Sequence, residues 1–218
     1  MSYATLDAPS MQRRLRILSL VDAAEKALLA PLSMRMLHLM AYLSNVLAPV
    51  WDMPVLDGKL LKKGEGPFYP VLQGDADSLV GHGLLIQSQL EYVLNADKQW
   101  RLQGAYTLNH QLTDGILEQL RSFPEERAMD AFCTEVAYSL SVLASEQLHE
   151  FSTADATYAD PQIDFGSVVD FAEWSKRNYA TRAAEQLGEL LPSGSTTTPG
   201  EKIHSYVRHL SRRLYARG

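Results

Sequence analysis

Apolar residues near the start of the chain recur at the spacing of a helix. From about Met11 to Leu29 they fall roughly on one face, which predicts a first helix. The break at Pro31-Leu32-Ser33 ends in a serine suited to an N-cap. The next segment, Met34 to Leu47, is apolar nearly all round, so we predict a second helix at the centre of the core. The apolar face of the first helix comprises Leu15, Leu18, Val21 and Leu28.

Residues 49–66 contain prolines and glycines and predict a long loop. Loops of this length often have a task, although a solvated surface loop is the simpler interpretation. A third helix is expected to start near Pro67 and to stop at Gly81-His82-Gly83, where a glycine suits the left-handed end of a helix. The loop carries three cations, Lys59, Lys62 and Lys63.

The pattern then changes from helical to extended. Leu84 to Val93 predicts a strand, and Asn95-Ala96-Asp97 predicts a turn. Trp100 to Leu108 alternates between an apolar and a polar face, so the two runs together predict a β-hairpin. The apolar face of the second strand comprises Trp100, Leu102, Gly104, Tyr106 and Leu108.

The second half of the chain returns to helical spacing. Helices are predicted at 113–122, at 124–150 and at 168–191, with a loop at 152–166 and a flexible linker at 192–199. A last helix begins after Thr198, because Pro199 and Glu201 follow it in the positions that favour a helix start.

The order helix, helix, helix, hairpin is that of a winged-helix domain. We therefore expect a mainly α protein with a small β-hairpin, in which a winged-helix N-terminal core at 11–110 is followed by a C-terminal helical region at 111–218 packed on it. Residues 1–10 are small and polar and are expected to form a flexible arm.

Winged-helix domains commonly bind either DNA or another protein, and the charge of the chain helps to distinguish these two functions. The chain of 218 residues has a net charge of −6, so phosphate binding is not its dominant surface property. The predicted third helix has Asp75 and Asp77 and no lysine or arginine, which disfavours reading of DNA bases by this helix. A protein partner is therefore preferred over DNA.

No motif in the chain predicts catalysis, a metal site or a cofactor site. The six histidines lack metal-ligand spacing, and no phosphate-binding or nucleophile motif is present. Asp155, Asp160 and Asp164 could together hold Mg²⁺, but a solvated acidic loop is preferred. Cys133, the one cysteine, is expected to be an inert thiol buried in a helix. We therefore expect no enzyme.

The last helix is basic. Cations are favourable at the C-terminal end of a helix, which alone could explain the basic residues. The more specific alternative is that they bind an acidic partner or a DNA backbone. Together with the three loop lysines, these residues are the candidate contacts to a partner or to DNA. They are Lys202, Arg208, Arg212 and Arg213, followed by Arg217. The chain shows no signal-peptide core and no apolar run of about 18 residues, so we expect a cytoplasmic protein without a membrane segment.

Several stretches, in order along most of the chain, resemble one family, the middle components of three-component ABC-ATPase systems. This group includes the accessory middle subunit of Lamassu-type anti-phage defence. The resemblance rests on Arg14-Leu15-Arg16-Ile17-Leu18, Leu37-His38-Leu39-Met40-Ala41-Tyr42-Leu43, Pro67-Phe68-Tyr69, Leu79-Val80-Gly81-His82-Gly83-Leu84, Phe171-Ala172-Glu173-Trp174, Asn178-Tyr179, and Thr198 to Tyr206.

The resemblance implies a role rather than a reaction. A middle subunit accompanies an SMC-like ATPase and an effector, often a nuclease, and would hold the effector to the ATPase and couple DNA sensing to effector activation. The alternative hypothesis is a winged-helix transcription regulator, which would be a dimer on a palindromic DNA site. The acidic third helix argues against that alternative.

Overall fold

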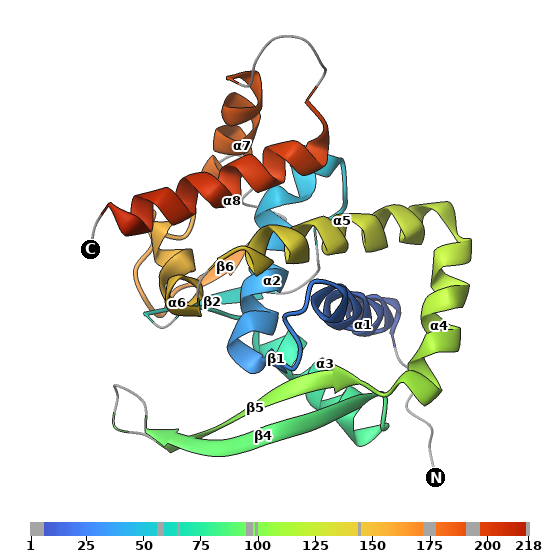
Figure 1. Ribbon diagram of the computed structural model, residues 1–218. Helices are drawn as coiled ribbons and strands as arrows, with labels where there is room; N and C mark the ends of the chain where they lie inside the picture. The colour runs from blue at the N-terminus through green and yellow to red at the C-terminus, as the bar shows by residue number, and fades with distance from the viewer. Residues whose placement is uncertain are drawn as a thin grey trace.

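The structure, a computed structural model, describes residues 7–55, 59–64, 66–94, 98, 100–143, 145–171, 178–190 and 197–216. The described chain is mainly helical with two small antiparallel sheets, which confirms the expected mainly α class (Figure 1). The helices are α1 (Ala8–Lys26), α2 (Met34–Leu47), the short 3-10 helix η1 (Ala48–Trp51), α3 (Pro70–Gly81), α4 (His110–Ser122), α5 (Pro124–Ser141), α6 (Ser145–Ala154), α7 (Tyr179–Glu189) and α8 (Pro199–Tyr215).

Two three-stranded sheets accompany these helices. The first has the strand order β1-β5-β4 and contains the predicted hairpin, and the second has the order β3-β2-β6. All pairs are antiparallel. The strands are β1 (Leu32–Ser33), β2 (Lys59–Lys63), β3 (Gly66–Phe68), β4 (Leu85–Leu94), β5 (Trp100–Leu108) and β6 (Val168–Asp170).

Helix α2 forms the centre of the core, as its all-round apolar pattern predicts. Every residue from Leu37 to Leu47 is buried. The helix contacts α1, α5, α7, β3 and β5, and Figure 1 shows it in the middle of the molecule. Ser33 is its N-cap and accepts a hydrogen bond from the amide of Met36 at 3.2 Å. Burial of each large apolar side chain contributes roughly 1.5–3 kcal/mol, so α2 is a main source of stability.

The ends of α1 differ from the prediction. The helix begins at Ala8, inside the span expected to be an arm, and residues 1–6 lie outside the described residues. It ends at Lys26, so Leu28 is not on its apolar face but is 91% exposed. Leu28 has a left-handed backbone, with φ 60°, and the amide of Leu29 donates to the carbonyl of Ala24 at 2.8 Å. This Schellman ending normally has glycine at the left-handed position.

Helix α3 ends in the same way, with glycine in the strained position. Gly83 has φ 74°, and the amide of Leu84 donates to the carbonyl of Leu79 at 2.9 Å. The predicted glycine turn before the hairpin is therefore confirmed.

The second sheet was not expected from the sequence. The segment predicted as a loop at 49–66 contains η1, β2 and the first residue of β3, and Val168–Asp170 is a strand rather than the start of a helix. The predicted third helix loses its first turn to β3, and the helix predicted at 124–150 is divided into α5 and α6. Strand β2 pairs Leu60 with Val169, far along the chain, so no local pattern marks either strand.

The C-terminal helix begins where predicted. Thr198 accepts a hydrogen bond from the amide of Glu201 at 3.3 Å, and the Glu201 carboxylate accepts one from the amide of Thr198 at 2.7 Å. This reciprocal capping box satisfies two amides that the helix would otherwise leave unpaired. The predicted turn at 95–97, the linker at 192–196, and residues Trp174 and Arg217 lie outside the described residues.

Candidate interaction surface

The β4–β5 hairpin carries six of the exposed large apolar side chains of the described structure. Figure 1 shows it as a long arm along one side of the molecule, whose outer part reaches away from α1. Tyr92 is 70% exposed and Trp100 is 67% exposed. A contiguous exposed apolar patch is a mark of an interaction site. The exposed large apolar side chains of the hairpin are Ile86, Leu90, Tyr92, Leu94, Trp100 and Leu102.

Strand register places four of these side chains on one face of the hairpin. Tyr92 lies opposite Leu102, and Leu94 lies opposite Trp100. Directly opposite residues in an antiparallel pair point to the same side, and residues two apart along a strand do so as well. We call this group, with Leu90, the outer face of the hairpin.

A β-bulge is what brings the β4 residues onto this face. Ser88 pairs with Ala105 and Glu91 with Gln103, so Gln89 and Leu90 together oppose Gly104. Gln89 has φ 52°, in the left-handed region. The extra residue shifts the alternation of β4 by one, and without it Glu91 would take the side that Tyr92 occupies. A side chain at Gly104 would lie 3.1 Å from a Leu90 methyl group, so glycine leaves room for Leu90 there.

The inner part of the same face belongs to the core. Leu85 lies opposite Leu108, and both are buried, as is Tyr106. This part packs against α1, α2 and α3. The predicted apolar face of β5 is therefore one continuous face, but only its inner half is covered, while Trp100 and Leu102 face solvent. The alternation of apolar residues in β5 predicts this face, but it does not show where the helices that cover the face end.

Only one of the two acids of helix α3 faces solvent. Asp75 is buried and accepts hydrogen bonds from Arg13 at 2.7 Å and from Arg14 at 3.1 Å. Burial alone would raise the pKa of Asp75, but these hydrogen bonds and one from Ser10 outweigh it and lower that pKa. Asp77 is exposed, so one of the two acids faces solvent and the other is neutralised internally.

The three lysines of β2 do not form one surface. Lys62 is buried, and its ammonium donates to the carbonyls of Asp160 at 3.0 Å and Ile163 at 2.7 Å. Burial lowers the pKa of Lys62, although Asp160 and Asp164 oppose the shift. Lys59 is exposed, and the ammonium of Lys63 lies 3.9 Å from the centre of the Phe68 ring. Lys62 therefore holds the 160–163 loop, which leaves it no free hydrogen-bonding role at the surface.

The cations of α8 likewise differ in their exposure to solvent. Arg208 and Arg212 are exposed and one turn apart, so they share a face, whereas Lys202 and Arg213 are half-buried. Helix α8 packs on α5, α6 and α7, whereas β2 pairs with β3 and β6. The structure does not bring the two basic segments into one patch.

The acidic loop after α6 does not assemble a metal site. Asp155 is fully buried and accepts hydrogen bonds from the hydroxyl groups of Tyr42 and Tyr206. Burial raises the pKa of Asp155, although these hydrogen bonds oppose the shift. Asp160 accepts a hydrogen bond from the amide of Gln162 at 2.9 Å. In the described ranges, no three side chains of His, Cys, Asp or Glu converge as metal ligands would.

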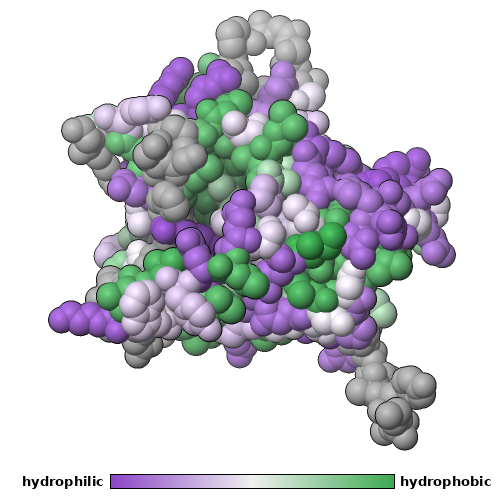
Figure 2. All heavy atoms as spheres, turned by 60° about the horizontal axis from the view of Figure 1, so that its bottom comes forward, coloured by the Kyte–Doolittle hydropathy of each residue, from purple (hydrophilic) through white to green (hydrophobic). Residues whose placement is uncertain are grey.

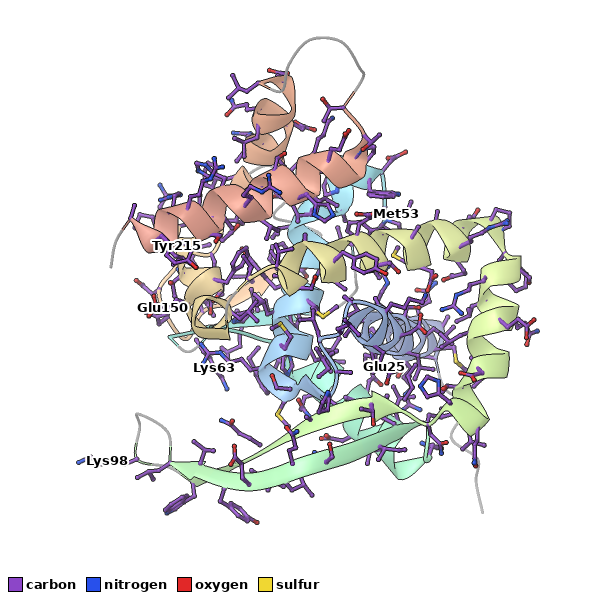
Figure 3. The ribbon with its side chains drawn as sticks, viewed as in Figure 1. Glu25, Met53, Lys63, Lys98, Glu150 and Tyr215 are labelled. Carbon is purple, nitrogen blue, oxygen red and sulfur yellow. The ribbon has the colours of Figure 1, made fainter. Side chains whose placement is uncertain are left out.

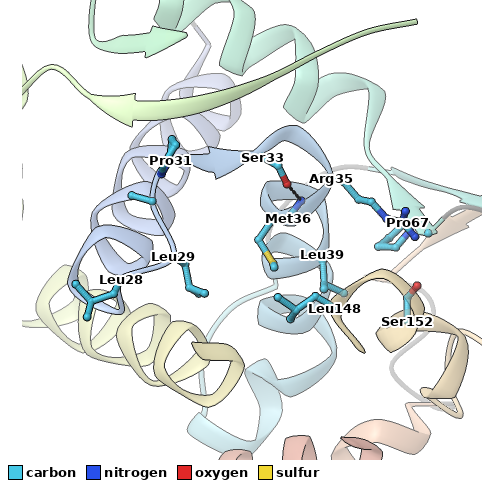
Figure 4. Close-up of a pocket in the computed structure, with 12 residues that line it drawn as sticks. Leu28, Leu29, Pro31, Ser33, Arg35, Met36, Leu39, Pro67, Leu148 and Ser152 are labelled. Atoms are coloured by element: carbon cyan, nitrogen blue, oxygen red, sulfur yellow. Dashed lines mark hydrogen bonds between the residues drawn. The ribbon is translucent and has the colours of Figure 1, made fainter. Parts of the chain in front are cut away.

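The cavities have volume, but their lining side chains do not indicate a reaction. One of about 430 Å³ lies between the end of α1, the start of α2, and α6, and Figure 4 shows Met36 and Leu39 of α2 facing it together with Leu148 of α6. Another, of about 620 Å³, lies between α1 and the start of α5. Cys133 is buried in α5, as predicted, and burial raises its pKa to about 11, which disfavours the reactive thiolate.

Figure 2 turns the hairpin side of the molecule forward and shows green apolar patches between purple polar ones. Comparisons with known proteins gave no match: no protein-family model, no curated protein and no solved structure matches the chain. In the helices that the structure describes, none is both long and apolar enough to cross a membrane.

Proposed function

We propose that this chain is a non-catalytic accessory subunit of an SMC-like ATPase complex in anti-phage or anti-plasmid defence, acting in the cytoplasm. In this role it bridges the ATPase and an effector, a nuclease in the simplest case, and couples DNA sensing to effector activation. The identity of these partners rests on the family resemblance of the sequence. The observation that carries the role of a bridging subunit is the outer face of the hairpin, which is apolar, exposed and held in place by a bulge.

We also propose that residues 8–108 form a winged-helix core with an inserted hairpin. The order α1, β1, α2, α3, β4, β5 and the sheet order β1-β5-β4 support this assignment. Strands β2 and β3, which lie between α2 and α3, are the insertion. The hairpin β4–β5 then corresponds to the wing.

Surface chemistry favours a protein partner over DNA for this core. A DNA-reading helix and its wing contact phosphates through lysine and arginine. Helix α3 has neither residue, and its exposed positions include Val71 and Asp77. The wing has the exposed Lys98 at its end, but it also exposes Tyr92 and Trp100, and aromatic residues are enriched where proteins meet.

The proposal is tested by co-expression with the products of the neighbouring genes. The tagged chain is purified, and the mass of the eluted species is measured by size exclusion with light scattering. We expect a stable complex that contains a large ATPase. With the double variant Tyr92→Glu, Trp100→Glu, the yield of this complex should fall at least tenfold, because burial of a charge in an apolar contact is costly.

A matched control is Val142→Glu, at the end of α5, where the side chain is 72% exposed outside the hairpin. This variant should retain the complex. A lone dimer that shifts a specific DNA fragment, with affinity falling steeply as salt rises, would instead establish the transcription regulator.

A further inference from the structure

We infer that the outer face of the hairpin receives one amphipathic α-helix from a partner protein. This inference rests on the proposed function and names the chemistry of the contact. It is carried by the juxtaposition of a helix-covered inner half and an uncovered apolar outer half on a single face of β4 and β5.

The continuity of the face points to a helix. On its inner half, Leu85 and Leu108 are buried against helices of this chain. Beyond the bulge, the same face continues as two cross-strand pairs, Tyr92 with Leu102 and Leu94 with Trp100. A sheet face of this kind is stable when another layer covers it, and in this molecule that layer is helical. The outer half lacks only the covering helix.

The dimensions of the outer face suit a short helix. From Leu90 to Leu94 a strand rises about 13 Å, at roughly 3.3 Å per residue. A helix covers that length in about nine residues, at 1.5 Å each. Such a segment presents apolar side chains at spacings of three and four residues, which is enough to contact both cross-strand pairs.

Charge near the patch adds an orientation. Lys98 lies at the outer end of the hairpin and is exposed, and Figure 3 shows it pointing away from the body of the molecule. No lysine, arginine, aspartate or glutamate lies among the outer-face residues themselves. We therefore expect the partner helix to be apolar over the outer face and to place an acidic residue near Lys98.

Addition of a strand to the edge of β4 is the less favoured geometry. A partner strand needs an unbroken row of backbone amides and carbonyls along the edge. The bulge at Gln89 interrupts that row and increases the local twist, which is a common way to block edge pairing.

The test uses the full chain co-expressed with the products of its neighbouring genes. A photoreactive benzoylphenylalanine replaces Tyr92, Leu94 or Leu102 in turn, and the matched control carries it at Ile86. Ile86 is 50% exposed, but it pairs with Thr107 on the opposite face of the same hairpin. Cross-linked sites are identified by mass spectrometry after irradiation of the purified complex.

We expect cross-links from the three outer-face positions to one partner segment, at spacings of three or four residues, and at least tenfold fewer from Ile86. Spacings of two residues, which mark a strand, overturn the inference, as do cross-links only to a second copy of this chain or to lipid. A complex that forms without cross-links from the outer face also overturns it and leaves the proposed function standing. If no complex forms, both fail.

Discussion

Arg13 of α1 holds Asp75 of α3, with 2.7 Å between the guanidinium Nε and the carboxylate Oδ2. Arg14 binds the other oxygen of the same carboxylate at 3.1 Å. The arginines at the start of α1, unfavourable for the helix dipole, therefore serve as the partners of a buried acid. The pair fixes α3 against α1 and removes Asp75 from the exposed surface of α3.

Replacement of Asp75 by Asn should destabilise the fold. The arginines would lose a charged acceptor, and we expect the free energy of unfolding at pH 7 to fall by about 1–3 kcal/mol. The pKa of Asp75 is lowered in the folded state, so its stabilising effect is present above the unfolded pKa of about 4 and is lost as pH falls through the folded pKa. Urea unfolding at several pH values measures both effects.

The matched control for this prediction is Asp77→Asn, two residues along the same helix. Asp77 is exposed and accepts a hydrogen bond from the Gln73 side chain at 2.8 Å. Its replacement should change the free energy of unfolding by less than about 0.5 kcal/mol. Equal effects of the two substitutions would contradict the assigned role of Asp75.

The buried Asp155 carboxylate should give the protein a pH response of the opposite sign. Because its pKa is raised in the folded state, the folded chain holds this proton more tightly than the unfolded chain. The free energy of unfolding should therefore fall as pH rises from about 4 through the raised pKa. Asp155→Asn should remove this part of the pH dependence, as measured by urea unfolding across that range.

Tyr206→Phe removes a hydrogen bond that stabilises the ionised form of Asp155. We expect a loss of about 1–3 kcal/mol at pH 7 and a decline that extends to higher pH. Tyr215→Phe, on the exposed part of the same helix, is the control and should leave the unfolding curve unchanged. A Tyr206→Phe curve that overlays the wild type would show that the hydrogen bond is not significant.

Two helix endings of the same type should respond in opposite directions. Leu28 and Gly83 both have left-handed backbones after a helix, with φ 60° and φ 74°. Leu28→Gly relieves the strain of a side chain in that region and should stabilise the protein by about 1 kcal/mol, whereas Gly83→Ala should destabilise it by a similar amount. Thermal unfolding followed by circular dichroism distinguishes the two. A fall in melting temperature for both would refute the argument from backbone strain.

Lys62→Met tests whether this lysine is an internal clamp. The substitution keeps the length of the side chain and removes the ammonium, so the carbonyls of Asp160 and Ile163 lose their donor. We expect a loss of about 1–3 kcal/mol in the free energy of unfolding. The exposed Lys59, on the same strand, provides the control, and Lys59→Met should be nearly neutral. If Lys62→Met left stability unchanged but lowered the affinity for a partner or for DNA, the lysine would instead be a surface contact.

The exposed arginines of α8 should matter only if the assembled complex contacts DNA through them. Arg208→Glu with Arg212→Glu is then expected to lower the affinity of the complex for DNA and to reduce the slope of log affinity against log salt by about two. Lys59→Glu serves as a single-charge control on a different element. Unchanged affinity in the double variant would exclude the α8 face as a DNA contact.

Local signals in the sequence account for most of the helices and the hairpin. Ser33 and Thr198 each precede an apolar run and serve as N-caps, and the alternation of Trp100 to Leu108 matches β5. The second sheet has no such signal, because the sequence of β2, Lys59-Leu60-Leu61-Lys62, does not alternate between apolar and polar residues, and the strand buries its second lysine. The stability of β2 depends on pairing with β6 and on the carbonyls of a distant loop. A short stretch of sequence around β2 contains neither of these partners.

The candidate site shows the same division. The apolar face of β5 is visible in the sequence, but the bulge at Gln89 is a property of the pairing with β5 and has no local mark. Without the bulge, Tyr92 and Leu94 would be assigned to the face opposite Trp100 and Leu102. The sequence shows the basic residues directly, but whether each is buried depends on tertiary contacts, as Lys62 shows.

The pairing of β2 with β6 also has a consequence for how the chain is made. The partner of Leu60 is Val169, so an emerging chain holds β2 with one edge open until more than a hundred further residues have been added. At typical synthesis rates of about 5–20 residues per second, this interval lasts roughly 5–20 s. Throughout it, the edge of β2 that pairs with β6 has no partner strand, and unpaired strand edges favour aggregation. Chaperone depletion during synthesis should therefore lower the yield of this protein.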